Sequence, residues 1–398
     1  MNSTIAHADA AGLVDERDQL MDLAEHLSGV ISLGLGDPDL PTPAHIVAAA
    51  KAAMRDGRCD HATHPAGLIE LRRAIAAKLA RDNGVIADPE TEITVTTGGQ
   101  EGLYVIVQAL LNPGDEILVP DPRYSSYDAA IGRTGGVITP VPTRQEDAFD
   151  LDPDEVARRI TPRTKAILLV TPGNPTAGVI SPANLRAIAE LAIAHDLVVI
   201  ADEIYEQFVF DGAEHFSIGS LPAMRERTIT LNGFSKSYAM TGWRLGYIAA
   251  PPALTRAIRA LKETVSISAP AISQWAGVAA LNGPQECVAA FRATYDARRR
   301  VVMPALDAMG LTYGHPYGTF YIFVNISSTG MTAFPLALKM LQEARVLIFP
   351  GTGFGPAWGD YLRFSLLQPT PVLMEAIARL GRVVRGEGQG TRMRQVAG

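Results

Sequence analysis

Short apolar runs of strand length alternate with helical patterns between about residues 45 and 285. Ala166–Val170 and Leu197–Ala201 are continuous apolar runs bounded by turn residues, which is typical of strands buried on both faces. Leu185–His195, between them, repeats apolar residues at helical spacing. Further strands are predicted at Thr91–Thr96, Glu116–Val119 and Thr228–Leu231. This alternation predicts an α/β fold, with a mostly parallel sheet sandwiched by helices.

The chain of 398 residues exceeds the usual size of a single hydrophobic core, so we expect two domains. Residues 46–285 form the predicted large domain. The pattern changes after residue 285, where a strand at Thr319–Ile326, a helix at Phe334–Ala344 and a strand at Tyr361–Leu366 predict a smaller α+β domain over 286–398. Residues 1–45 are assigned to an N-terminal arm and part of the small domain, and residues 386–390 to a frayed tail.

Charge and cysteine content exclude several classes of protein. Interspersed charges, 35 basic against 42 acidic with a net charge of −7, argue against a nucleic-acid partner. The first twenty residues lack the apolar segment of a secretory signal, and the apolar runs are too short to span a bilayer. Cys59 and Cys287 have neither disulfide-framework nor metal-ligand spacing. We therefore expect a cytoplasmic protein that has no membrane segment and no metal site.

Residues suited to ligand chemistry follow each predicted strand. In open α/β sheets, ligands bind at the carboxyl ends of the strands. Those ends carry, in chain order, Gly99, Tyr124, Asn174, Asp202 and Lys236. Because these positions converge on one edge of a parallel sheet, we expect them to share a single ligand.

Lys236 narrows the chemistry of that ligand most. It lies in a loop of small residues after a strand, and Arg244 follows eight residues later. A lysine amine forms a Schiff base with an aldehyde, and a guanidinium binds a phosphate, so the pair suits a cofactor that carries both groups. Asp202 ends a wholly apolar strand and needs a cationic partner, such as a protonated pyridine nitrogen, while Tyr205 could hydrogen-bond a ring hydroxyl. An aspartate that caps a helix is the alternative for Asp202.

Three further positions fit the same ligand. Gly98-Gly99-Gln100 opens a helix after a strand, where free N–H groups favour a phosphate. Asn174, in the turn Thr171–Gly178, could direct its amide at the ring hydroxyl or at a substrate carboxylate. Arg363 is a lone cation in an apolar strand, so it either captures a substrate carboxylate or lies on an exposed face of that strand.

These residues together resemble the class I/II aminotransferases, which are fold-type I enzymes that use pyridoxal phosphate (PLP). The resemblance runs from Leu33–Asp39 to Leu362–Ser365, and the run from Asn232 to Arg244 is the most specific part. It implies that Lys236 binds the cofactor aldehyde, that Asp202 binds the pyridine nitrogen, and that Tyr205 and Asn174 contact the ring oxygen. It assigns the remaining contacts to Tyr124 and Ile204 on the two ring faces, to Arg244, Ser235, Gly99 and Gln100 at the phosphate, and to Gly36, Asn174 and Arg363 at the substrate.

The family resemblance also implies a two-stage reaction and a homodimer with shared active sites. Lys236, displaced by the substrate amine, would remove the Cα proton and return it at the cofactor, so that a keto acid leaves and a second keto acid accepts the amino group. Two departures from the family stand out. Ala177 replaces a glycine in the Asn-Pro-Thr-Gly motif, which Gly178 is expected to compensate. Ala62, between His61 and His64, stands where a tyrosine usually reaches the partner's phosphate.

Three functions are weighed against one another. The leading hypothesis is an aminotransferase acting between an L-amino acid, small, acidic or aromatic, and a 2-oxo acid. The alternative is a lyase, replacement or cyclising enzyme that uses the same cofactor, and Ala62 with its two histidines keeps it open. A ligand-sensing regulator would need a basic DNA-binding extension, and the N-terminal residues are too few and too acidic for one.

Overall fold

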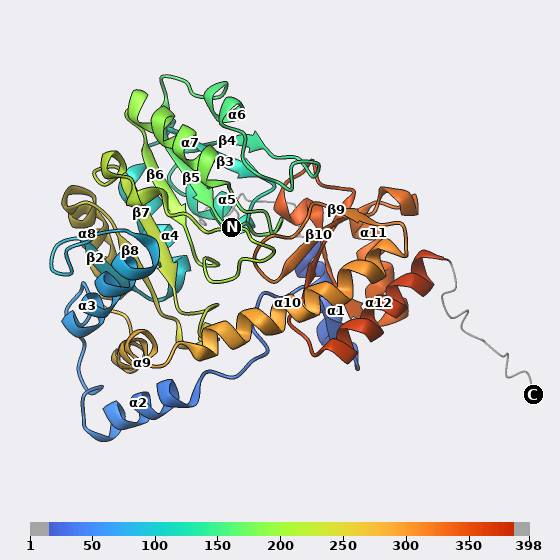
Figure 1. The fold of residues 1–398 in the computed structure, drawn as a ribbon, viewed down its shortest axis with the longest axis horizontal. Coiled ribbons are helices and arrows are strands. Elements are labelled where there is room, and N and C mark those ends of the chain that lie inside the picture. Colours follow the sequence, from blue (N-terminus) through green and yellow to red (C-terminus); the bar gives the residue numbers. More distant parts are fainter. Residues whose placement is uncertain (1–15, 386–398) are drawn as a thin grey trace, which may run out of the picture. The chain divides into compact units, whose positions relative to one another are not determined.

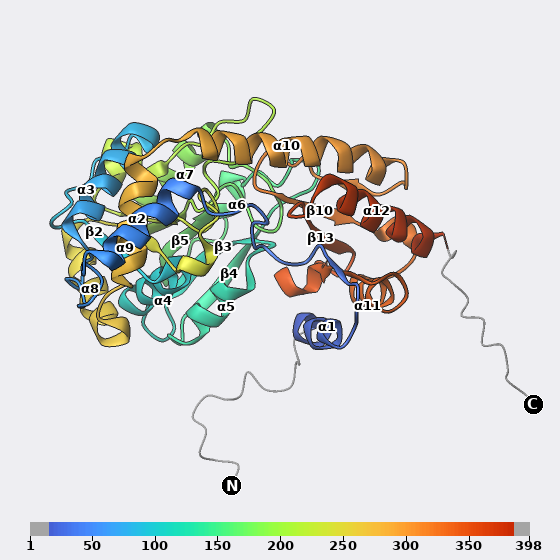
Figure 2. The same ribbon diagram turned by 90° about the horizontal axis from the view of Figure 1, so that it is seen from below.

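A computed structural model describes residues 16–385, which form two compact units (Figures 1 and 2). The large unit comprises Gly36–Ala297 and Gly314–Tyr321. Within the described residues, the small unit comprises 16–35, Arg298–Tyr313 and 322–385. The chain passes between the units at 35/36, 297/298, 313/314 and 321/322, whereas the sequence suggested two boundaries, at 45/46 and 285/286. The predicted tail at 386–390 lies outside the described residues, as does the first part of the predicted arm.

A seven-stranded sheet in the order β2-β8-β7-β6-β5-β3-β4 forms the centre of the large unit (Figure 1). β8 is antiparallel to both of its neighbours, and the other pairs are parallel. This confirms the predicted mostly parallel sheet. The strands are β2 (Ile93–Thr96), β3 (Glu116–Asp121), β4 (Val137–Pro142), β5 (Thr164–Val170), β6 (Val198–Asp202), β7 (Thr228–Gly233) and β8 (Gly246–Ala249).

Helices cover both faces of this sheet, and this explains why the run Ala166–Val170 of β5 is apolar throughout. Leu168 packs into a cluster with side chains of α4, α5 and α8, whereas its neighbours Ile167 and Leu169 pack into a second cluster with α7. Alternate side chains of a strand point to opposite faces, so a strand buried on both faces has no polar positions. The helices are α4 (Gly98–Leu110), α5 (Ser125–Gly132), α6 (Pro153–Ala157), α7 (Pro182–Ala194) and α8 (Pro252–Ser266).

A third cluster of apolar side chains lies around β2 and β8, under the helices α2 (Ala44–Arg55), α3 (Ile69–Lys78) and α9 (Ala271–Asn282). A π-helical turn, η1 (Leu79–Asn83), extends α3. It brings Asn83 back toward the sheet, where the side chain is buried. Short 3₁₀ turns occur at Ile218–Ser220, Pro222–Met224 and Thr241–Trp243.

The small unit has the predicted α+β character. β1 (Ile31–Ser32) pairs in parallel with β11 (Val346–Leu347). A separate sheet has the order β12-β13-β10-β9, and its β12–β13 and β10–β9 pairs are antiparallel. The strands of this sheet are β9 (Thr312–Tyr313), β10 (Tyr321–Asn325), β12 (Phe349–Pro350) and β13 (Tyr361–Ser365). The helices of the small unit are α1 (Glu16–Glu25), α11 (Ala333–Ala344) and α12 (Thr370–Val384), with 3₁₀ turns at Ser327–Thr329 and Gly351–Phe354. The long helix α10 (Glu286–Asp307) contributes residues to both units.

Among residues 16–385, no helix combines the length and the apolar character that crossing a membrane requires.

Candidate active site

Asp202 ends β6, and two hydrogen bonds hold its carboxylate. The hydroxyl of Tyr127 in α5 donates to Oδ2 at 2.8 Å, and the backbone N–H of Ile204 donates to Oδ1 at 3.2 Å. Burial raises the pKa of Asp202 to about 6, although these hydrogen bonds and the charge of Lys236 favour the ionised form. The carboxylate therefore lies where a further cation would stabilise it.

Lys236 follows β7 in a loop, and its amine lies close to a segment 200 positions earlier in the chain. Nζ donates to the carbonyl oxygen of Gly36 at 2.5 Å and lies 6.0 Å from the ring centroid of Phe320. The side chain is half-buried. Attraction between the Lys236 ammonium and the Asp202 carboxylate lowers the pKa of Asp202, so the two groups act on each other.

Tyr205 follows Asp202 by three residues, and its ring is buried. Its hydroxyl lies 3.3 Å from that of Tyr321, and its ring meets Phe320 edge-on with centroids 5.4 Å apart. The hydroxyl of Tyr321 lies so close to Gly36 that a Cβ at position 36 would come within 2.1 Å of it. Glycine is therefore required at position 36, which also supplies the acceptor for Lys236.

Glycines at the start of α4 allow a guanidinium to approach the helix. Gly98 has φ of 77°, and a Cβ there would fall 2.7 Å from Nη2 of Arg244. A Cβ on Gly246 would fall 2.8 Å from the backbone nitrogen of Gly99. The first turn of a helix has free N–H groups and the positive end of the helix dipole, to which Arg244 adds a full charge. This combination binds anions, phosphate above all.

The comparison with protein families decides the identity of this arrangement. The sequence model of the family "Aminotransferase class I and II" matches residues 28–380. The chain belongs to this family.

Individual relatives agree with the family assignment. This aminotransferase is 40% identical over 369 residues to aromatic-amino-acid aminotransferase 2 of Thermococcus litoralis, covering 92% of this chain and 95% of that protein. It is 40% identical over 385 residues to the aspartate aminotransferase of Pyrococcus abyssi, covering 96% and 99%. The structure of an aromatic aminotransferase from Pyrococcus horikoshii OT3 matches with a TM-score of 0.88 and 42% identity, covering 92% of this chain and 99% of that one. The fold is the predicted fold-type I, and the predicted amino-group transfer is confirmed.

The other predicted residues of the large unit of this aminotransferase lie at or just beyond strand ends. Asn174 is buried in the turn after β5. Tyr124 precedes α5, and its ring meets that of Tyr127 edge-on with centroids 5.8 Å apart. Ser235 is buried beside Lys236, Gln100 is exposed on the first turn of α4, and a Cβ on Gly233 would fall 3.2 Å from Cδ1 of Ile204. The roles predicted for these residues remain predictions.

Arg363 belongs to the small unit, in contrast to the other predicted site residues. Its side chain is buried, so the alternative of an exposed face of β13 is wrong. Nη2 donates to the carbonyl oxygen of Gly34 at 2.5 Å, and the guanidinium carbon lies 4.7 Å from the ring centroid of Phe354 and 5.7 Å from that of Phe349. Aromatic rings and a carbonyl acceptor keep a buried guanidinium charged.

The chain departs from the family pattern at Ala177 and at Ala62. Ala177 itself adopts the left-handed conformation, with φ of 59°, so the expectation that Gly178 compensates for it is wrong. The turn needs this conformation because the N–H of Ala177 donates to Gly173 and its carbonyl accepts from Gly318. His61 and Ala62 are exposed, while Nδ1 of the exposed His64 accepts from the N–H of Ala66 at 3.1 Å. That bond gives His64 a local role in the loop.

Tyr127 and Tyr321 are contacts of the candidate site that the sequence reasoning missed. Tyr127 follows Tyr124 by three residues at the start of a helix, and this spacing could have indicated that both rings face the same side. Tyr321 gives no comparable signal, because its contact with Tyr205 spans 116 residues of the chain.

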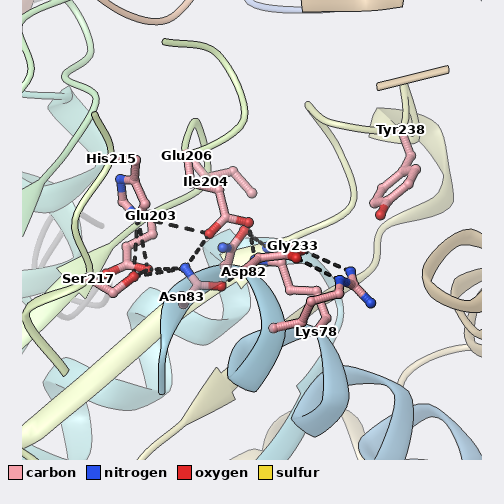
Figure 3. A network of polar contacts seen from close by, with 12 residues as sticks. Lys78, Asp82, Asn83, Glu203, Ile204, Glu206, His215, Ser217, Gly233 and Tyr238 are labelled. Carbon is pink, nitrogen blue, oxygen red and sulfur yellow. Dashed lines mark hydrogen bonds and ion pairs between the residues drawn. The ribbon is translucent and has the colours of Figure 1, made fainter. Parts of the chain in front are cut away.

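Three side chains behind the Asp202–Tyr205 turn have ligand atoms close enough to hold a metal ion: Glu203, Glu206 and His215 (Figure 3). Their ligand atoms lie within 4.8 Å of one another. The ammonium of Lys78 is already in direct contact with Glu206, and the amide of Asn83 donates to both carboxylates. The cluster therefore has a cation from its own chain, and we assign no metal to it.

Proposed function

We propose that this aminotransferase uses PLP to move an amino group between an L-amino acid and a 2-oxo acid. The observation that carries the proposal is the set of groups at one edge of the large sheet. Asp202 ends β6, Lys236 lies in the loop after β7, and Arg244 lies later in that loop with its guanidinium at the first turn of α4. PLP, when bound, supplies an aldehyde for amines and a ring that withdraws electrons from the substrate carbon.

The residues present fit this cofactor. Because Gly98 and Gly246 have no side chains, the guanidinium of Arg244 and the strand β8 lie close against the start of α4. This positively charged helix start suits a phosphate, to which Gly99, Gln100 and Ser235 would add donors. Asp202 would pair with the ring nitrogen, because burial raises the pKa of this carboxylate and a cation at that position would stabilise its charged form. Tyr205 and Asn174 would bind the ring oxygen, and Tyr124 and Ile204 would contact the two faces.

The chain's own groups would then perform the proton transfer. Nζ of Lys236 would hold the cofactor aldehyde until the amine of the substrate displaces it. The freed Nζ would then take up the Cα proton of the substrate and return that proton. Asp202 would keep the ring nitrogen protonated throughout. Arg363 and Asn174 would bind the α-carboxylate, and Gly36 would border the substrate.

A balance of nitrogen tests transfer against elimination. Purified holoenzyme would be given aspartate, phenylalanine or alanine with 2-oxoglutarate, and glutamate, free ammonia and the keto acid would be measured. We expect one glutamate per keto acid, with acidic and aromatic donors preferred because the relatives named above act on those classes. Stoichiometric release of ammonia would contradict the proposal in favour of a PLP-dependent lyase.

We also propose a cytoplasmic homodimer with shared active sites. Cys59 and Cys287 are free thiols, as expected in a reducing compartment. His61 and Ala62 are exposed in the segment that the family uses to reach its partner's phosphate, and His61 is the group that could replace the usual tyrosine. Sedimentation of the holoenzyme tests the dimer. The PLP affinity of His61→Ala, measured together with its sedimentation, tests the contact that His61 would make with the partner's phosphate.

Arg363→Lys should weaken binding of the amino donor selectively. A lysine keeps the charge but loses the bidentate geometry, so KM should rise about 10- to 100-fold while the visible absorption of bound PLP is unchanged. Arg298→Lys is the matched control, because Arg298 is also buried in the small unit and donates to a backbone carbonyl, that of Leu366, at 2.9 Å. An equal rise of KM in both variants would contradict the role of Arg363.

Tyr127→Phe should shift the pH dependence of PLP binding upward. Burial raises the pKa of Asp202 to about 6, and the hydrogen bond from Tyr127 opposes this rise. Loss of that hydrogen bond should therefore raise the pKa of Asp202 further. Asp202 must be ionised to pair with the ring nitrogen, and affinity is therefore lost at a higher pH than in the wild type.

Titration of the cofactor-free protein with PLP between about pH 5 and 8 measures this shift. The phosphate of PLP also titrates near pH 6, but its contribution cancels between variant and wild type. Tyr247→Phe removes another buried hydroxyl, that of β8, and should leave the pH dependence unchanged. Identical profiles for Tyr127→Phe and the wild type would show that the tyrosine does not act on Asp202.

A further inference from the structure

We propose that a buried polar network behind the Asp202–Tyr205 turn is a positioning device for the cofactor contacts on that turn. The proposal rests on the proposed use of PLP. The network consists of Lys78, Asn83, Glu203, Glu206, His215 and Ser217 (Figure 3).

The network is connected to the turn through Glu203 and Glu206, which are direct chain neighbours of predicted cofactor contacts. Asp202, Ile204 and Tyr205 are the predicted contacts on this turn, and Glu203 and Glu206 directly follow Asp202 and Tyr205. Both glutamates are buried. A shift of either glutamate would move its neighbour, because successive Cα atoms are joined at a constant spacing of about 3.8 Å.

Glu206 is held from α3 and from the π-helical turn η1. The ammonium of Lys78 contacts its Oε1, and Nδ2 of Asn83 lies 2.6 Å from its Oε2. Nζ of Lys78 also donates to Oδ1 of Asn83 at 2.7 Å, which fixes the orientation of the amide. These partners lie more than 120 residues from Glu206 in the chain.

Glu203 is held by the same asparagine and by the segment after β6. Nδ2 of Asn83 lies 3.0 Å from its Oε2, and the hydroxyl of Ser217 donates to that oxygen at 2.7 Å. Nε2 of His215 lies 3.3 Å from Oε2 of Glu203 and 4.0 Å from Oε2 of Glu206. Asn83 therefore joins the two glutamates, and each has a second anchor of its own.

Charge balance makes this arrangement rigid. Two buried carboxylates face the ammonium of Lys78 and the imidazole of His215. Burial opposes protonation of His215, but the adjacent carboxylates of Glu203 and Glu206 outweigh it and raise the pKa of the imidazole. With His215 protonated, the two positive and two negative charges cancel. Displacing any one of them would leave an uncompensated buried charge, so the turn has one strongly favoured position.

Backbone hydrogen bonds also hold the turn, among them those from Thr171 to the carbonyl of Asp202 at 3.2 Å and from Phe208 to the carbonyl of Tyr205 at 2.9 Å. The N–H of Glu203 donates to the carbonyl of Leu231 at 2.9 Å, and that of Glu206 donates to the carbonyl of Glu203 at 3.0 Å. The side-chain network therefore constrains the turn in addition to the contacts of Tyr127 with the Asp202 carboxylate and of Tyr321 with the Tyr205 hydroxyl. We classify its members as positioning residues, since none of them needs to touch the cofactor.

Glu206→Gln and Glu203→Gln test the proposal in the holoenzyme, since glutamine keeps the size of the side chain and removes its charge. Misplacement of Asp202 and Tyr205 should lower kcat about tenfold, with KM for the amino donor changed less than about threefold. The pH at which the visible absorption of bound PLP changes should move by at least about 0.3 units, since that absorption reports the surroundings of the ring. PLP should also dissociate faster.

Glu116→Gln is the matched control. Glu116 is equally buried and charged, pairs with Arg163 and Thr161, and begins β3 at the amino-terminal edge of the parallel strands. Loss of the Glu116 charge should lower Tm without moving the pH midpoint of the change in PLP absorption. The proposal is overturned if the network variants lower Tm alone, or if the control moves the midpoint equally.

Ser217→Ala provides the test if a charge-removing variant fails to fold, because it leaves every charge of the network in place and removes only the contacts of one hydroxyl, with Glu203, Asn83 and His215. A smaller shift of the same absorption midpoint supports the proposal, and an unchanged midpoint and kcat overturn it. The wild-type protein separates this outcome from failure of the proposed function. If wild-type protein binds no PLP, the cofactor assignment itself is wrong, whatever the network does.

Discussion

Lys236→Ala should abolish amino transfer, lowering kcat on the order of 10⁴-fold or more, and should remove the visible absorption that covalently held PLP gives. The reason is that one amine would serve both as the covalent anchor and as the base at the substrate carbon. In the large unit this amine has the carbonyl of Gly36 as an acceptor and lies in the field of Asp202, and alanine replaces neither interaction. Absorption spectra of the purified variant with added PLP, together with turnover, measure both effects.

Lys262→Ala is the control for the loss of a partly desolvated lysine. Lys262 lies in α8, donates to the carbonyl of Ile267 at 3.1 Å, and has a pKa lowered by burial. Its replacement should reduce stability but leave the absorption and kcat near wild-type values. If Lys236→Ala keeps the wild-type spectrum, another amine holds the cofactor.

Asp202→Asn should lower kcat about 10³-fold and weaken PLP binding. An amide of the same shape can still accept a hydrogen bond from Tyr127, but it cannot balance a positive charge on the ring nitrogen. Preorganised charges of this kind at a reaction centre are worth about 10²–10³-fold in kcat. Rates with saturating PLP separate the catalytic loss from the binding loss.

Asp150→Asn is the matched control for this substitution. Asp150 also accepts a backbone N–H, that of Ser181 at 3.0 Å, and it lies outside the candidate site. We expect turnover within about twofold of the wild type. Equal losses in the two variants would mean that the carboxylate of Asp202 has only a structural role.

The sequence predicted the strands that are buried on both faces, and the structure explains which strands escaped notice. β5 and β6 contain the continuous apolar runs Ala166–Val170 and Val198–Ala201, so their pattern survives without knowledge of their neighbours. β4 lies at the sheet edge and contains Pro140 and Pro142, which an edge strand tolerates but which disguise it as a loop. β8 has only four residues and directly follows a loop rich in small residues.

The candidate site was predictable where it depends on strand ends and unpredictable where it depends on distant pairs. Asp202 follows an apolar run, and Lys236 lies in a loop of small residues after a predicted strand, so local patterns found both. Tyr127 meets Asp202 across 75 residues, and Lys78 meets Glu206 across 128. Such contacts arise from the packing of α5 and α3 against the sheet, and a single sequence contains no local record of them.

The antiparallel direction of β8 has a consequence for how this enzyme can change. Because β8 returns alongside β7, with Gly233 paired to Gly246, the chain between them is a single hairpin loop that carries both Lys236 and Arg244. The proposed covalent anchor, Lys236, and the proposed phosphate ligand, Arg244, thus belong to one continuous segment, and the distance between them depends on its dozen residues. An insertion or deletion in this hairpin would disturb both ends of the cofactor together. Substitutions elsewhere, Arg363 in the small unit included, can alter the choice of amino donor without changing that spacing.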